Sequence, residues 1–144
     1  MEINKLIEKF NEGSIRALGK AITIVENREK DADFLLHELN KNTGKAHIIG
    51  FTGSPGAGKS SLIDSLVSHL RKNNIKVGII AVDPSSPFTG GAILGMGIRM
   101  IQHSTDKGVF IRSMANRGRT GGLGIATRDA IKVLDAFSFE GYYY

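Results

Sequence analysis

One eight-residue stretch, Gly53-Ser54-Pro55-Gly56-Ala57-Gly58-Lys59-Ser60, combines glycines with a lysine and a serine at a fixed spacing. It matches the phosphate-loop pattern G-x-x-x-x-G-K-[ST] at every fixed position. Glycines let the backbone bend sharply and approach a polyphosphate closely. Successive backbone N–H groups in such a loop converge on the anion. The stretch therefore predicts a site for the phosphates of a nucleotide.

The side chains at the end of the stretch suit that chemistry. Lys59 is predicted to reach the β- and γ-phosphates, and the Ser60 hydroxyl to ligate Mg²⁺. The alternative is a glycine-rich turn that binds nothing, and the complete motif between a strand and a helix disfavours it. The residues predicted to contact the nucleotide are Gly53, Pro55, Gly56, Ala57, Gly58, Lys59, Ser60 and Ser61.

The elements on either side of the motif support it. Residues 47–52 form a short apolar run that is typical of a buried parallel strand. A helix is predicted after the motif, and its N-terminus would favour phosphate. The apolar face predicted for this helix comprises Leu62, Ile63, Leu66, Val67 and Leu70.

A carboxylate follows the next predicted strand. Residues 76–82 read as a second buried strand, which ends at Asp83. In open α/β sheets, ligands bind outside the carboxyl ends of the strands. Asp83 is therefore predicted to help hold Mg²⁺ and, with Lys59, to serve in catalysis. The alternative is an Asx-type turn before Pro84.

Two glycine-rich segments follow. Residues 88–100 are apolar as well as glycine-rich, as in a segment that orders against a ligand, so residues 83–100 are predicted to be a switch-like region. A third strand is predicted at 109–112. In the loop after it, Arg117 or Arg119 would stabilise phosphate charge, remain solvated or pair with a partner's carboxylate, and these three alternatives stay open.

Residues 1–45 are predicted to form three amphipathic helices. Gly13 ends the first, Ser14 caps the second, and Gly44 stops the third. A last helix is predicted from about residue 127. The N-terminal helices are either a small subdomain or an arm for a partner or dimerisation. Their predicted inward residues are Ile3, Leu6, Ile7, Phe10, Ile15, Leu18, Ile22, Val25, Phe34, Leu35 and Leu39.

Length and composition indicate an ordinary soluble globular protein of one domain's length. Of 144 residues, 41% are hydrophobic and 23% are charged, and there is no cysteine for a disulfide or a thiolate metal site. The net charge of +5 is dispersed, which argues against a nucleic-acid partner. No apolar run approaches the roughly 20 residues of a membrane span. A cytoplasmic location is expected, because the N-terminus lacks the apolar region of a signal peptide.

Several segments in a fixed order carry a specific resemblance to the MeaB/ArgK family of P-loop GTPases, which belongs to the SIMIBI class. The resemblance covers about residues 14–140. Besides the phosphate loop, the matching segments are 16–18, 21–23, 82–87, 90–95, 99–100, 110–113, 117–118, 121–124 and 126–128.

The resemblance implies a three-layer P-loop NTPase fold with a mostly parallel sheet. A helical arm at 1–45 would precede a G domain at 46–144, with its phosphate loop at 53–60. It implies Mg²⁺-dependent binding of GTP and GDP, GTP hydrolysis, and a homodimer. The partner would be an adenosylcobalamin-dependent mutase of the methylmalonyl-CoA type, served by a GTPase metallochaperone. Two alternatives are an ATPase or kinase of a lysine/arginine/ornithine transport system and a non-catalytic nucleotide-binding module.

The chain departs from the family pattern at two places. Met96 and Gly97 stand where the family usually has an acidic residue followed by Lys or Arg, so a group that organises magnesium or water is missing. The sequence stops at Tyr144, before the family's Walker-B strand and its guanine-reading N-K-x-D motif. We therefore expect a segment of a longer protein or a truncated product, and the preference for GTP over ATP follows from the resemblance alone.

Overall fold

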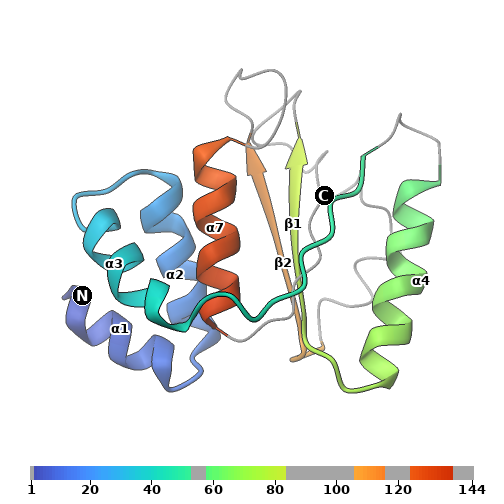
Figure 1. The fold of residues 1–144 in the computed structure, drawn as a ribbon, viewed down its shortest axis with the longest axis horizontal. Helices are drawn as coiled ribbons and strands as arrows, with labels where there is room; N and C mark the ends of the chain where they lie inside the picture. Colours follow the sequence, from blue (N-terminus) through green and yellow to red (C-terminus); the bar gives the residue numbers. More distant parts are fainter. Residues whose placement is uncertain (1, 53–57, 84–105, 116–123, 138–144) are drawn as a thin grey trace. The chain divides into compact units, whose positions relative to one another are not determined.

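The computed structural model describes residues 2–52, 58–83, 106–115 and 124–137. In these residues the chain is a mixed α/β protein with a small parallel sheet (Figure 1). It forms two compact units, one of residues 1–46 with 123–139 and one of residues 47–122 with 140–144. The boundary expected between an arm at 1–45 and a G domain at 46–144 remains a prediction. None of the described helices is long and apolar enough to cross a membrane.

The first unit is helical. It contains α1 (Ile3–Asn11), α2 (Ile15–Glu26), α3 (Ala32–Leu39), the 3₁₀ turn η1 (Asn40–Asn42) and α7 (Ile125–Ala136). Helix α2 packs against α1, α3 and α7, and α7 also contacts α3 and η1. The core between them is formed by Leu6, Phe10, Leu18, Ala21, Ile22, Val25, Leu35, Leu39, Ala130, Val133 and Leu134.

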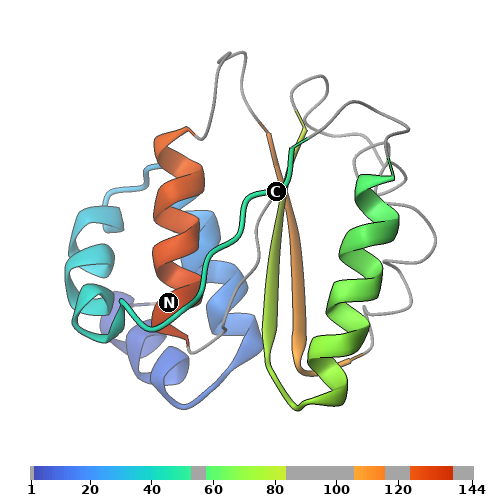
Figure 2. The same ribbon diagram turned by 45° about the vertical axis from the view of Figure 1, so that its right-hand side comes forward.

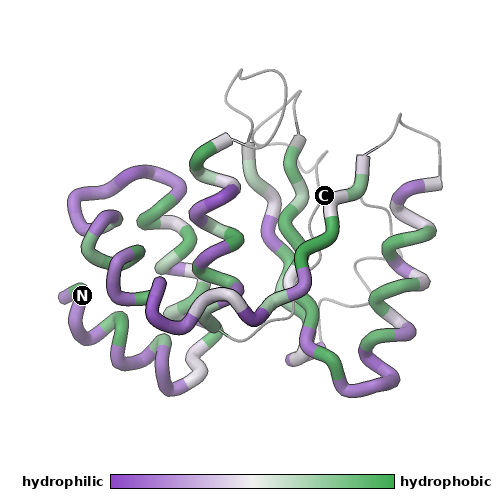
Figure 3. Tube along the Cα trace, in the orientation of Figure 1, coloured by the Kyte–Doolittle hydropathy of each residue, from purple (hydrophilic) through white to green (hydrophobic). Residues whose placement is uncertain are grey.

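Local sequence explains the start of α2 and the helix before it. The Ser14 hydroxyl accepts the Ala17 N–H at 3.2 Å, as an N-cap does, and Gly13 before it has a φ of +90°. Along α1, hydrophilic and hydrophobic residues alternate (Figure 3), and the buried Phe10 meets the Phe137 ring edge-on at 5.0 Å. The predicted cap at Ser14 and the break at Gly13 are confirmed.

Two residues predicted to face inward are exposed instead. The exposed fraction is 47% for Ile15 and 46% for Phe34. Ile15 is the first residue of α2, at the helix end. In α3 the buried stripe runs through Ala32, Leu35 and Leu39, and Phe34 lies about 100° around the helix from Leu35. Spacing alone does not show which apolar residues a neighbouring helix covers.

The second unit contains the sheet and one helix. Strands β1 (Val77–Asp83) and β2 (Val109–Ala115) are parallel, with Val77 opposite Val109 and Asp83 opposite Ala115. Helix α4 (Lys59–Lys72) lies beside the strands (Figure 2). The core they share comprises Ile63, Val67, Leu70, Val77, Ile79, Ala81 and Val109.

The strands predicted at 76–82 and 109–112 are thus confirmed, and β2 extends to Ala115. The face predicted for the helix after the motif is confirmed in part. Leu66 is half-buried beside the three core residues of α4, but Leu62 is 59% exposed. Leu62 lies outside the stripe through Ile63, Val67 and Leu70, so its predicted burial is wrong.

The buried parallel strand predicted at 47–52 is also wrong. Only Gly50 makes a bridge there, and Ile48 is 52% exposed. Ile49 and Phe51 are half-buried, and Phe51 packs against the core of the second unit. This alternation is that of an extended chain covered on one face, since successive side chains in such a chain point to opposite sides.

An ion pair joins the last turn of α4 to the turn that precedes β2. Arg71 donates to the Asp106 carboxylate from Nε at 2.8 Å and from Nη2 at 3.1 Å. It also donates from Nη1 to the Ile75 carbonyl at 3.0 Å, and Asp106 accepts the Gly108 N–H at 2.9 Å. The hydrogen bond to Asp106 raises the pKa of Arg71 above its ordinary value.

Gly108 provides a test of this ion pair. A Cβ at this position would overlap the guanidinium of Arg71, although the backbone there is open to any residue. We expect Gly108→Ala to displace the guanidinium and to lower the free energy of unfolding by about 1–3 kcal/mol, as for the loss of a charged hydrogen bond. The measurement is denaturant unfolding of wild type and variant.

Gly19→Ala is the matched control, because a Cβ at Gly19 in α2 meets nothing within 4 Å. It should raise the free energy of unfolding by about 0.5–1 kcal/mol, since alanine favours a helix interior over glycine. Equal stability of Gly108→Ala and wild type would show that the ion pair contributes nothing.

Candidate functional site

Helix α4 begins directly after a glycine in a left-handed conformation. Gly58 has φ +88° and ψ +10°, and its carbonyl accepts the Leu62 N–H at 3.0 Å, which closes the first helical turn. This backbone conformation is strained for residues with a Cβ, but glycine adopts it without strain. Gly58, the last glycine of the motif, is thus the residue whose conformation leads the chain into α4.

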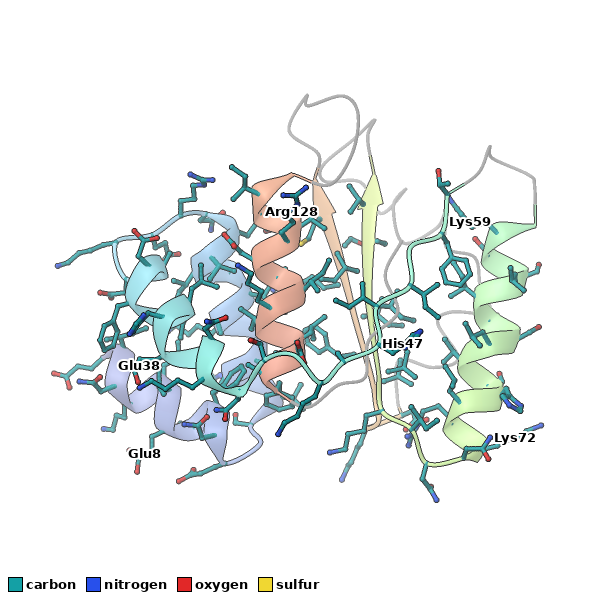
Figure 4. The ribbon with its side chains drawn as sticks, viewed as in Figure 1. Glu8, Glu38, His47, Lys59, Lys72 and Arg128 are labelled. Carbon is teal, nitrogen blue, oxygen red and sulfur yellow. The ribbon has the colours of Figure 1, made fainter. Side chains whose placement is uncertain are left out.

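The first residues of α4 are Lys59, Ser60 and Ser61. The first N–H groups of an α-helix point out of its end and carry partial positive charge. No acidic side chain lies in this first turn. Lys59 and Ser60 are half-buried and Ser61 is exposed. Figure 4 shows Lys59 at the start of α4 and Lys72 at its far end. The start of α4 therefore has the charge and the donors that an anion needs.

The C-terminal end of β1 lies on the same side of the second unit as the start of α4. Strand β1 ends at Asp83, opposite Ala115 of β2. In Figure 1 the arrowheads of both strands point toward the side on which α4 begins. The backbone of Asp83 is thus at the edge where Lys59 and Ser60 lie. A serine hydroxyl and a carboxylate are oxygen donors of the kind that Mg²⁺ prefers.

The remaining predicted site residues lie outside the described parts of the chain. Within the parts described, no group of three or more His, Cys, Asp or Glu side chains could hold a metal ion. The predicted residues that fall outside are Gly53, Pro55, Gly56, Ala57, the switch-like residues 84–100, Arg117 and Arg119.

One structurally prominent residue was not predicted. The carboxylate of Asp135, near the end of α7, accepts backbone N–H groups of Gly44, Lys45 and Ala46. These partners are about 90 residues earlier in the chain. The available signal was weak: an aspartate directly after Val133 and Leu134, near the end of the predicted helix.

Comparison with known proteins identifies a matching family and similar proteins. A family described as "Methylmalonyl Co-A mutase-associated GTPase MeaB" matches residues 18–142. A protein of Pyrococcus horikoshii named "Putative GTPase PH0274" is 58% identical over 138 residues, which are 96% of this chain and 44% of that protein. The "Fused isobutyryl-CoA mutase" of Geobacillus kaustophilus is 35% identical over 144 residues, covering 93% of this chain and 13% of that protein.

A solved structure shows the same fold. The crystal structure of an LAO/AO transport system kinase superposes with a TM-score of 0.75 at 23% identity. The match covers 99% of this chain and 43% of that one. The chain therefore has the fold of the corresponding part of that kinase, and it spans less than half the length of the similar P. horikoshii protein.

Lys59 provides the first test of the site. We expect Lys59→Ala to weaken the binding of nucleoside triphosphate roughly 10- to 100-fold, because a charge-assisted contact to phosphate is lost. Isothermal titration with GTP and Mg²⁺ measures the dissociation constant. Lys72→Ala removes the same charge from the other end of α4 and should leave the affinity unchanged. Equal affinity of Lys59→Ala and wild type would contradict the phosphate-loop assignment.

Proposed function

The chain belongs to the MeaB family of methylmalonyl Co-A mutase-associated GTPases, and on that premise we propose that it binds GTP with Mg²⁺ and hydrolyses it at the start of α4. One observation carries the proposal. The left-handed Gly58 leads directly into Lys59 and Ser60 at a helix N-terminus, within a complete phosphate-loop motif. Such an end of a helix favours an anion through both its N–H donors and its dipole.

In this proposal the chain's own groups bind and orient the triphosphate. Backbone N–H groups of residues 56–61 and the Lys59 ammonium hold the phosphate oxygens. The Ser60 hydroxyl and Asp83 would hold Mg²⁺, whose charge offsets that of the β- and γ-phosphates. In-line attack of water forms a new bond from its oxygen to the γ-phosphorus while the bond from that phosphorus to the β-phosphate oxygen breaks, giving GDP and inorganic phosphate, which retains the protons of the water. Lys59 stabilises the negative charge that moves to the leaving oxygen.

Guanine as the base is a further part of the proposal. A phosphate loop binds the triphosphate and makes no distinction between bases. Membership of a GTPase family supports guanine. We propose GTP and GDP as the ligands on that basis.

The proposed partner is an adenosylcobalamin-dependent acyl-CoA mutase. The family's description as mutase-associated supports this partner. So does the similar segment of a Geobacillus kaustophilus protein that is named a fused isobutyryl-CoA mutase. In this role the protein is a GTPase metallochaperone that acts as a homodimer. Residues 83–100 would order around the γ-phosphate and report the nucleotide state to the mutase.

Titration of the chain with nucleotides tests the proposal. GTP with Mg²⁺ should bind more tightly than ATP with Mg²⁺, and EDTA should weaken the binding of GTP, because the metal offsets the phosphate charge. Isothermal titration measures each dissociation constant, with GDP as a third ligand. Equal affinity for GTP and ATP would contradict guanine selectivity in this chain. Failure to bind any of the three would contradict the site itself.

Asp83 tests the metal part of the site. We expect Asp83→Asn to slow Mg²⁺-dependent GTP hydrolysis by at least roughly tenfold, since removal of one stabilising group from a phosphoryl-transfer site has effects of this size or larger. Phosphate release under excess GTP measures the rate. Asp64→Asn, a carboxylate within α4, is the control and should hydrolyse GTP at the wild-type rate. Full activity of Asp83→Asn would exclude Asp83 as a ligand that catalysis needs.

A further inference from the structure

The excess positive charge of the chain lies entirely in the second unit. The first unit contains ten Lys and Arg residues and ten Asp and Glu residues, so its formal charge is zero. The second unit contains nine Lys and Arg residues and four Asp and Glu residues, which accounts for the whole net charge of +5. The cations of the second unit are therefore not balanced by nearby acidic residues in the way that those of the first unit are.

Three of these cations are exposed at one end of the second unit. Lys72 ends α4, Lys76 directly precedes β1, and Lys107 lies in the turn before β2. The starts of β1 and β2 lie together, because the two strands are parallel and Val77 is opposite Val109. Figure 1 shows the end of α4 on the same side, and Figure 4 shows Lys72 there. These three lysines are called the basic edge below.

Hydrogen bonds fix the backbone that carries the basic edge. The Val77 N–H donates to the Gly108 carbonyl at 2.8 Å, which joins the start of β1 to the turn before β2. Arg71 bridges the same two places, because it donates to the Ile75 carbonyl at 3.0 Å and to the Asp106 carboxylate at 2.8 Å. A backbone that is already ordered lowers the entropic cost of binding a partner.

No free carboxylate offsets the three charges among the described residues of the second unit. The carboxylates there are those of Asp64, Asp83 and Asp106. Asp64 is in the first half of α4, and Asp83 is at the opposite end of β1. Asp106 is at the basic edge, but Arg71 already pairs with it. Within the described parts of the chain, none of the three lysines forms an ion pair.

The stability of α4 accounts for only one of the three lysines. Cations are favoured in the last turn of a helix, where Lys72 lies, because they offset the helix dipole. This effect falls off beyond the last turn. Lys76 and Lys107 are outside the helix, so the dipole does not explain them. Three exposed lysines at one end of the unit are what a surface for an anionic partner would contain.

The chemistry of the basic edge favours protein carboxylates over nucleic acid or a membrane. Nucleic-acid single strands are bound by aromatic side chains as well as by cations, and residues 69–76 and 106–108 contain no Phe, Tyr or Trp. Bidentate contacts to phosphate come from arginine, but Arg71 already binds Asp106. Polybasic sites for anionic lipids contain about four to eight Lys or Arg residues, which is more than this edge has.

We propose that the basic edge is a docking surface for an acidic segment of a protein partner, rich in Asp and Glu. The first and last residues of α4, Lys59 and Lys72, are roughly 20 Å apart, since a helix rises about 1.5 Å per residue. A partner at the basic edge therefore leaves the start of α4 accessible to nucleotide. This docking surface goes beyond the proposed function and does not depend on the binding of GTP.

The first test is a titration of the ¹⁵N-labelled wild-type chain with an oligoglutamate peptide at low ionic strength, without nucleotide. The amide signals of Lys72, Lys76 and Lys107 should move most and saturate together, and added salt should weaken the binding because it screens exposed charges. The amides of Lys5 and Lys20, exposed lysines of the first unit, should stay in place. Shifts that are largest elsewhere, or no shifts, would overturn the inference.

The second test removes the three charges. We expect the variant with Lys72→Ala, Lys76→Ala and Lys107→Ala to bind the peptide roughly tenfold more weakly, since each exposed ion pair contributes modestly. Fluorescence anisotropy of the labelled peptide measures the dissociation constant. The amide spectrum shows whether the variant is folded. If it is not folded, the titration of the wild-type chain decides alone.

The matched control removes three exposed lysines from the first unit, through Lys5→Ala, Lys20→Ala and Lys30→Ala. It changes the net charge by the same amount and should bind the peptide as wild type does. An equal loss of affinity in both variants would show that the peptide responds to net charge alone, and would overturn the inference.

Two other probes test the class of partner. A single-stranded DNA oligonucleotide and vesicles that contain phosphatidylserine are titrated under the same conditions. Both should bind more weakly than the peptide. Tighter binding of either one, lost in the basic-edge variant and retained in the control, would assign the surface to nucleic acid or to a membrane and overturn the inference. Because nucleotide is absent throughout, these outcomes are independent of whether the chain binds GTP.

Discussion

The left-handed turn at Gly58 is the constraint on which the site depends. With Gly58 in this conformation, α4 starts at Lys59, and Lys59, Ser60 and Ser61 occupy its first turn. A residue with a Cβ would strain this turn. The glycine thus determines where the helix begins, and the helix N-terminus brings together the positive side chain, the hydroxyls and the N–H donors that a phosphate requires.

The far end of α4 and the sheet hold that arrangement in place. Ile63, Val67 and Leu70 pack on the face of β1, and Arg71 joins the last turn of α4 to the turn before β2 through Asp106. Parallel pairing of β1 with β2 then directs both strand ends, with Asp83, toward the edge where α4 begins. Within the second unit, the packing of α4 on β1 and the Arg71–Asp106 ion pair therefore support the placement of the residues proposed to bind phosphate and Mg²⁺.

Much of the secondary structure could be predicted from local sequence. Helix caps, apolar helix faces and turn glycines depend on only a few neighbouring residues. Ser14, Gly13 and the 76–82 strand are examples. Local patterns did not show that Ile48, Phe34 and Leu62 would be exposed, since exposure depends on which neighbours cover each residue. They also carry no information on pairs distant in sequence, such as Arg71 with Asp106 or Asp135 with residues 44–46. The phosphate motif was identified because its spacing reflects the shape of its ligand.

The central claim is that the start of α4 binds the phosphates of GTP. The most direct measurement is a titration of the ¹⁵N-labelled chain with GTP and Mg²⁺, followed by amide chemical shifts in NMR spectra. The amide signals of Gly58, Lys59 and Ser60 should move most and saturate together, while those of His69 and Lys72 at the other end of α4 stay in place. Shifts confined to other parts of the chain, or none at saturating GTP, would contradict the claim.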